Sequence, residues 1–130
     1  SLVGSEMCIR DSICSFKSII RPDCVMLPCT SDVHQDHQVI CNEGIRCFKG
    51  NCDIMGYEAA HNMVQSPVMS CFVSLRKKHI KLKTKSWECF ASQTIKRDFK
   101  YVKSLSHVRG EQAGVKYAEA FEPIHIKYEF

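Results

Sequence analysis

The first half of the chain shows an apolar run, a periodic segment and a second apolar run, in the order expected of a strand, a helix and a strand. The first apolar run covers residues 24–27, and the second strand is expected over residues 53–57 (Asp-Ile-Met-Gly-Tyr). Between them, apolar side chains recur every three or four positions from Cys41 to Phe48, and a glycine follows at position 50 as a helix stop. Because a strand, a crossover helix and a second strand form a parallel pair, the pattern predicts a β-α-β unit.

The second half of the chain gives a less uniform pattern. Residues 77–90 fit two patterns. Side chains at alternate positions from Ile80 to Thr84 suggest a strand, whereas Ile80, Thr84 and Trp87, three or four positions apart, suggest one face of a helix. A helical stripe over residues 95–105 is expected to end at Arg109-Gly110, and residues 124–130 alternate like a half-buried strand. Together with the β-α-β unit, these elements predict an α/β fold with a Rossmann-like, mostly parallel sheet and flanking helices.

Composition and charge are those of an ordinary soluble domain. The 130 residues are 45% apolar and 25% charged, with a formal net charge of +4. Much of that charge lies in residues 76–85, which we interpret as a solvated helix face; it lacks the interleaved aromatic residues of a nucleic-acid site. No stretch reaches the roughly 18 apolar residues of a membrane span. We therefore predict a cytoplasmic protein with no nucleic-acid partner and no membrane span, and leave a homo-oligomer open.

Nine cysteines suggest two other kinds of site, a disulfide scaffold and a structural zinc site. Their number is odd, no secretory signal precedes them, and several lie inside apolar strand or helix patterns. No two of them have the Cys-x-x-Cys spacing of a zinc knuckle. We therefore expect buried free thiols.

The strongest chemical signal is His34-Gln35-Asp36-His37, which follows the first predicted strand and opens the helix. Neutral imidazole is the commonest protein metal ligand, and a nearby carboxylate such as Asp36 can fix the tautomer and orientation of its ring. Functional loops gather at the carboxyl ends of parallel strands. Because side chains so close in sequence diverge at a helix start, they cannot fill a tetrahedral zinc site alone, and other ligands must come from elsewhere.

Five ordered motifs make the chain, from about Ile19 to its end, resemble the carboxyl-terminal half of the LmbE-like, or PIG-L, family of zinc-dependent N-deacetylases. They are the His34–His37 box after a loop with Pro28 and Asp32, Gly56-Tyr57-Glu58, Ser92-Gln93 after a Lys-bearing segment, Arg109-Gly110, and Tyr117-Ala118-Glu119-Ala120-Phe121. The resemblance favours a helix over residues 77–90.

The resemblance implies a role for each residue of the histidine box. His37 corresponds to a zinc ligand, His34 to the general acid or oxyanion stabiliser, and Asp36 to an orienting partner in catalysis. An early His-Pro-Asp-Asp box, which in the family supplies two further ligands and the general base, has no counterpart in this sequence. The chain is therefore expected to be an inactive fragment, whose parent removes an acetyl group from an N-acetylated amino sugar or its conjugate.

The start of the chain has a different character from the rest. The string from Ser1 to Ser12 resembles a translated cDNA-library adapter. We therefore expect residues 1–12 to be a non-native leader and residues 13–130 to be the carboxyl-terminal part of a deacetylase domain.

Two residues after the second predicted strand, Glu58 and His61, could contact substrate. A structural hydrogen bond suits Glu58 equally well, and a solvated loop position suits His61. A function of another class also stays open, in which the chain is a non-catalytic α/β binding module and its histidine pair is structural.

Overall fold

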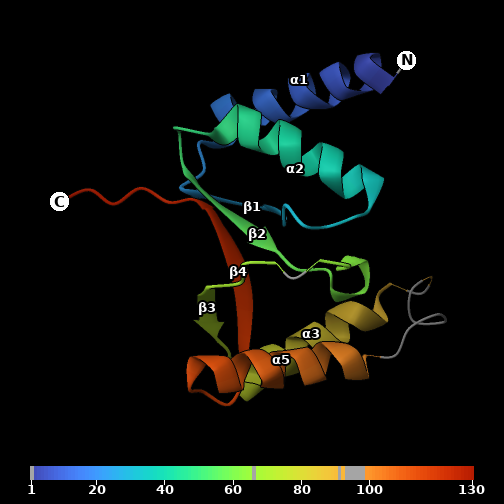
Figure 1. Cartoon of the computed structure of the whole chain (residues 1–130), viewed down its shortest axis with the longest axis vertical. Helices are drawn as coiled ribbons and strands as arrows, with labels where there is room; N and C mark the ends of the chain where they lie inside the picture. The colour runs from blue at the N-terminus through green and yellow to red at the C-terminus, as the bar shows by residue number, and fades with distance from the viewer. Residues whose placement is uncertain (1, 66, 91, 93–98) are drawn as a thin grey trace. The chain divides into compact units, whose positions relative to one another are not determined.

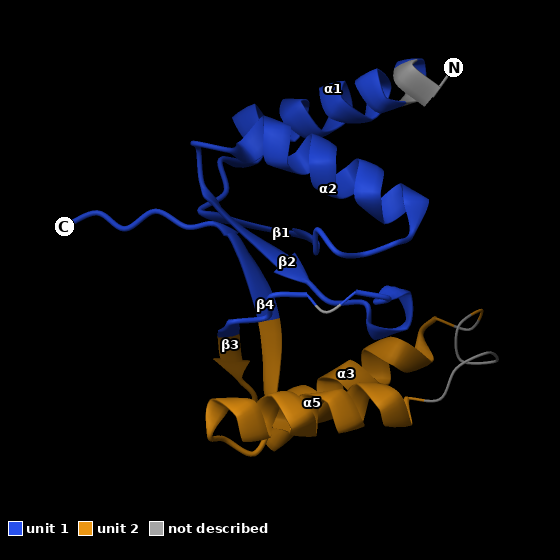
Figure 2. Ribbon diagram, in the orientation of Figure 1, with its two compact units in different colours: residues 1–71, 121–130 blue, residues 72–120 orange. Residues whose placement is uncertain are grey.

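The computed structural model describes residues 2–65, 67–90, 92 and 99–130. It divides into two compact units, coloured separately in Figure 2. Unit 1 comprises residues 1–71 and 121–130, and unit 2 comprises residues 72–120.

Unit 1 contains the predicted β-α-β unit (Figure 1). Strand β1 (Cys24–Pro28) pairs in parallel with β2 (Asp53–Tyr57), and helix α2 (Gln35–Phe48) connects them. The core between helix and strands is a cluster of buried side chains: Leu27, Cys47, Phe48 and Ile54. The helix ends as its glycine predicts, because Gly50 has the positive φ of 82° that favours glycine.

The sheet is mixed, with strand order β1-β2-β4-β3. This confirms the α/β class and corrects the expectation of a mostly parallel sheet, because β4 (Ala118–His125) pairs with β2 in the antiparallel direction. The pairing of Tyr57 with Phe121 shows why: the chain leaves β2 and enters β4 at the same end of the sheet, so no crossover is needed. The last strand was predicted over residues 124–130, but β4 ends at His125, so residues 126–130 lie after the strand.

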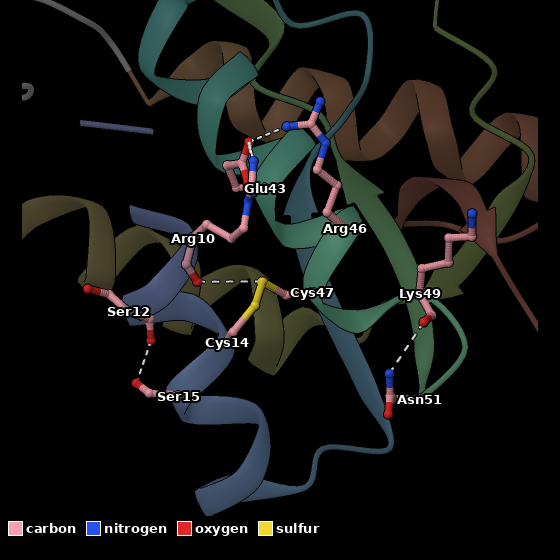
Figure 3. Close-up of a disulfide and its surroundings, with 9 residues drawn as sticks. All are labelled: Arg10, Ser12, Cys14, Ser15, Glu43, Arg46, Cys47, Lys49 and Asn51. Carbon is pink, nitrogen blue, oxygen red and sulfur yellow. Dashed lines mark hydrogen bonds and ion pairs between the residues drawn. A yellow bond between two sulfur atoms is a disulfide. The ribbon is translucent and has the colours of Figure 1, made fainter. Parts of the chain in front are cut away.

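Helix α1 (Leu2–Ile20) lies against α2 and includes most of the expected leader. In Figure 3, Cys14 of α1 is joined to Cys47 of α2 by a disulfide, with a Cα–Cα distance of 5.3 Å. Buried free thiols were predicted, so the prediction is wrong for this pair. The other seven cysteines are free, but only Cys29 and Cys41 among them are buried. The adapter interpretation of residues 1–12 stays a prediction, since a helix can form on either kind of sequence.

A buried carboxylate lies beside the disulfide. Glu43 of α2 is 2% exposed and pairs with Arg10 of α1 and Arg46 of its own helix (Figure 3). The hydrogen bond from Arg10 is the main reason that the pKa of Glu43 is lowered. An ion pair and a disulfide therefore both hold α1 on α2.

Unit 2 holds most of β3 (Cys71–Ser74) together with helices α3 (Lys77–Glu88) and α5 (Lys100–Ala113). The structure settles the ambiguous segment as a helix, as the resemblance favoured. Helix α5 continues past Arg109-Gly110, where a stop was predicted, and ends at Gly114, whose φ is 70°. Gly110 serves packing instead, because a Cβ there would lie 2.6 Å from the carbonyl oxygen of Lys116.

Two sequence signals, Gln93 and the start of the 95–105 stripe, lie outside the described residues. Among the helices of the described chain, none is both long and apolar enough to cross a membrane.

Candidate functional site

The histidine box lies in the loop between β1 and α2, and two contacts fix the start of that loop. The Cys29 N–H donates to the Tyr57 carbonyl at 2.9 Å and so extends the pairing of β1 with β2. Thr30 is held by the carboxylate of Glu122 on β4, through its N–H at 2.8 Å and its hydroxyl at 2.6 Å. The start of the loop is therefore hydrogen-bonded to both β2 and β4.

Asp32 is the centre of the hydrogen bonding in this loop, and its side chain is buried. Its Oδ1 accepts the backbone N–H of His34 at 2.8 Å, and its Oδ2 lies 2.7 Å from Nδ1 of His37. Nδ2 of Asn62 lies 3.5 Å from the same Oδ2. Burial raises the pKa of Asp32, but these hydrogen bonds outweigh it, so the pKa is lowered overall. The carboxylate is therefore ionised at neutral pH.

The ionised carboxylate determines where the proton of His37 sits. Because Asp32 can only accept, Nδ1 of His37 carries the hydrogen, which leaves the lone pair of a neutral ring on Nε2. A histidine that donates one ring N–H to a carboxylate and offers the other nitrogen is the usual arrangement of a metal ligand. The His37 side chain is 31% exposed, so Nε2 belongs to a ring that solvent reaches.

His34 has the opposite tautomer. It is the N-cap of α2, and its Nδ1 accepts the backbone N–H of Asp36 at 3.2 Å. The hydrogen of its neutral ring is then on Nε2, where it can donate to a bound group. The two rings are close, with centroids 4.7 Å apart. The pair thus combines one nitrogen lone pair, on His37, with one N–H donor, on His34.

The carboxylate that orients the pair is Asp32, whereas the sequence pointed to Asp36. Asp36 is exposed, and it meets His34 through its backbone N–H. Asp32 was named in the sequence only as part of the loop motif. Its position two residues before His34 and five before His37 was the available signal, because a loop that turns back on a helix start brings such residues together.

The segment after β2 braces the same loop. It contains a short 3-10 turn, η1 (Ala60–Asn62), and the carbonyl of Asn62 accepts the N–H of Val33 at 3.3 Å. Met63 forms an isolated antiparallel bridge with Asp32. The two predicted substrate residues, half-buried Glu58 and exposed His61, belong to this segment. Nothing in the sequence pointed to Asn62.

Zinc, which the resemblance implies, fits His37 as one ligand with its orienting carboxylate in place. Among the described residues, however, no three His, Cys, Asp or Glu side chains form a group that could hold a metal ion. A stable catalytic zinc takes three protein ligands. His37 would therefore supply one ligand of a set that the described residues do not complete.

A surface pocket lies at the other end of β1. It is lined by residues that include Lys17, Arg21 and Asp23, and by no histidine. Asp23 precedes β1, while His34 and His37 follow it. The pocket is thus separate from the histidine loop, and none of its lining residues takes part in the hydrogen bonds of His34 and His37.

Comparison with known proteins gives similarity of structure and none of sequence. The sequence matches no protein-family model and no curated protein. The fold is similar to the crystal structure of the conserved protein TT1542 from Thermus thermophilus, with a TM-score of 0.75 and 18% identity over 93% of this chain and 60% of that one. It is also similar to the N,N'-diacetylchitobiose deacetylase from Pyrococcus horikoshii, with a TM-score of 0.65 and 17% identity over 94% of this chain and 54% of the deacetylase.

At identities of 18% and 17%, these similarities show a deacetylase-like fold and no activity. The chain spans 60% of the length of the first of these proteins and 54% of the second.

Proposed function

We propose that this chain is part of a zinc-dependent N-deacetylase of the LmbE-like, or PIG-L, type, which acts in the cytoplasm on an N-acetylated amino sugar or its conjugate. The proposal is supported by the motifs in the sequence and by the fold shared with a diacetylchitobiose deacetylase. The single observation that carries it is the 2.7 Å contact between Oδ2 of Asp32 and Nδ1 of His37, because it leaves Nε2 of His37 as a metal-binding nitrogen.

Each residue of the histidine loop then has a task. His37 would hold the zinc through Nε2, and Asp32 keeps that ring in the required tautomer and orientation. Zinc, when bound, would supply a nucleophilic water at neutral pH and polarise the acyl carbonyl. His34 offers an N–H donor next to His37, suited to stabilise a developing oxyanion. For the general-acid role that the resemblance also implies, the ring would first have to be protonated at Nδ1, in place of the hydrogen bond from the Asp36 N–H. Asp36 contributes its backbone N–H, which fixes the tautomer of His34.

The remaining zinc ligands, the general base and the substrate contacts are not among the residues of the histidine loop. The other ligands and the general base would come from a His-Pro-Asp-Asp box outside this sequence. Glu58 and His61 would contact the sugar, since their segment is joined to the histidine loop through Asn62 and Met63.

One observation favours a second candidate, a non-catalytic binding module with a structural histidine pair. His34 is the N-cap of α2, and its side chain accepts a backbone N–H of the first turn, which stabilises the helix whether or not the residue has a catalytic role. Under this alternative, replacing His37 would change neither metal content nor any hydrolysis.

The test uses a longer protein from the same gene that includes sequence upstream of this chain. It is purified without chelators, its zinc is measured by mass spectrometry, and release of acetate from N-acetylglucosamine conjugates is followed. We expect about one zinc per chain and activity, both lost in His37→Ala. His125→Gln is the matched control, because His125 pairs with Ile54 at the far end of β2. A metal-free protein, or a His37→Ala variant as active as the wild type, would support the binding module instead.

A further inference from the structure

The two units of the chain differ in charge. Unit 2 contains twelve Lys and Arg against four Asp and Glu, a formal net of +8. Unit 1 contains six Lys and Arg against ten Asp and Glu, a formal net of −4. The mild net charge of the whole chain therefore hides a strongly basic unit, and such asymmetry is typical of a part that meets an anionic partner.

Helix α3 carries much of this charge and divides it between two faces. The inner face holds Ile80, which is buried, and Trp87. The ring of Trp87 meets that of Tyr101 on α5 edge-on, with 5.9 Å between the ring centroids. Lys83 lies on the same side and pairs with Glu119 at the start of β4. These contacts attach α3 to its own unit.

The outer face of α3 consists of Lys78, Lys81, Leu82 and Lys85. Their spacing of three and four residues places them on one side of the helix, and all four are exposed. Leu82 is 62% exposed in the middle of the three lysines. The one acidic residue of the helix, Glu88, is in its last turn. Other large apolar side chains of the chain are at least as exposed, so what distinguishes Leu82 is its place between three lysines on one helix face.

We propose that this outer face binds an anionic lipid surface. Lysine side chains can reach lipid head groups while a leucine between them enters the boundary of the acyl chains, which is how basic amphipathic helices lie in a membrane interface. A nucleic acid would satisfy the charge, but the outer face has no aromatic residue on which a base could stack. The inference uses unit 2 alone and stands whether or not the proposed function holds.

The experiment measures binding of the 130-residue chain to phosphatidylcholine vesicles that contain about 30% phosphatidylserine. We expect binding at low ionic strength, a steep loss as salt rises, and none to pure phosphatidylcholine. The variant Lys78→Gln/Lys81→Gln/Lys85→Gln should bind about a hundredfold more weakly, since each lysine near an anionic surface contributes about fivefold. The matched control Lys17→Gln/Lys49→Gln/Lys127→Gln has the same net charge but changes unit 1, and should bind within about threefold of the wild type.

The leucine is tested separately from the charge. Leu82→Asn should weaken vesicle binding by about fivefold and leave the salt dependence unchanged, because it removes apolar contact and no charge. Circular dichroism checks that each variant is folded; if the triple variant is not, Lys81→Gln alone and the salt dependence of the wild type still test the charge.

Three results would overturn the proposal. One is equal binding to vesicles with and without phosphatidylserine. Another is an equal loss in the unit 1 control variant. The third is tighter binding to duplex DNA than to the anionic vesicles, which would assign the basic face to a nucleic acid.

Discussion

Oδ2 of buried Asp32 lies 2.7 Å from Nδ1 of His37, across the turn by which the chain enters α2. The same carboxylate accepts the backbone N–H of His34. One side chain thus fixes the ring of one histidine and the backbone of the other, and it does so from the interior. The chemistry proposed for this loop therefore depends on a residue that neither binds metal nor meets solvent.

The first prediction concerns the stability of this loop and its dependence on pH. The pKa of Asp32 is lower in the folded chain than its ordinary value of 3.8. Its stabilising contribution is therefore complete above about pH 3.8 and is lost as the pH falls through the folded pKa. Asp32→Asn should lower the free energy of unfolding by about 1–3 kcal/mol at neutral pH, where charge-assisted hydrogen bonds are lost. The difference between variant and wild type should shrink below pH 3.8.

Urea unfolding from pH 2 to 7 measures this difference. Subtracting the two curves removes the contributions of other carboxylates, such as Glu43, that both proteins share. Asp36→Asn is the control, because the exposed Asp36 uses only its backbone N–H in this loop. A difference between Asp32→Asn and wild type that stayed constant down to the lowest pH would contradict the lowered pKa.

The second prediction concerns Gly56, where β2 approaches the start of the histidine loop. A Cβ at this position would lie 2.8 Å from the backbone Cα of Cys29 and 3.0 Å from the Glu122 carboxylate. Because the backbone of a paired strand cannot move away cheaply, Gly56→Ala should destabilise the chain by about 2–4 kcal/mol. Gly44→Ala is the comparison, since the nearest atoms to its Cβ belong to the Leu27 side chain, and a side chain can shift more readily than the backbone of a paired strand. Thermal melting of both variants measures this, and an equal or larger loss in Gly44→Ala would show that the close approach to Cys29 is not the constraint.

The third prediction separates the two histidines in a longer, metal-binding protein. His34→Ala should lower turnover by about a hundredfold or more and leave the zinc content nearly stoichiometric, because losing the N–H group that meets the reacting substrate costs rate and not ligation. His37→Ala should lose the metal first. Zinc content and turnover, measured on the same preparations, show the difference. Loss of zinc in His34→Ala with zinc retained in His37→Ala would mean that the two roles are exchanged.

The fourth prediction concerns the disulfide between α1 and α2. Cys14 and Cys47 are separated by 33 residues in sequence. The loss of chain entropy for a loop of that length gives an upper value of about 3–4 kcal/mol for its stabilisation. Cys14→Ser should therefore lower the melting temperature by several degrees in the absence of reductant and should not respond to added dithiothreitol. Cys8→Ser, which replaces an exposed free cysteine of the same helix, should melt like the wild type and respond to dithiothreitol as it does. A wild-type chain whose melting is unaffected by dithiothreitol would contradict the contribution of this bond.

The sequence by itself determined the local elements and their chemistry. The spacing of apolar residues gave β1, α2 and β2, and the histidine box was correctly placed at the start of α2. Such features depend on residues within a few positions of one another, where the helix and strand periods act directly. The ambiguity over residues 77–90 shows the limit of that signal, because one stretch matched both periods until the contacts of Ile80 and Trp87 decided for a helix.

Only the tertiary structure decided which of the candidate groups meet. Asp32 rather than Asp36 orients His37, because the loop turns back and is braced by Asn62 from a segment 30 residues away. Cys14 meets Cys47, and Gly110 packs against Lys116 instead of ending its helix, for the same kind of reason. Strand β4 runs antiparallel to β2, because the chain returns at the end of the sheet where it left. None of these pairings follows from the helix or strand period, since each depends on how a loop turns or on how two elements pack.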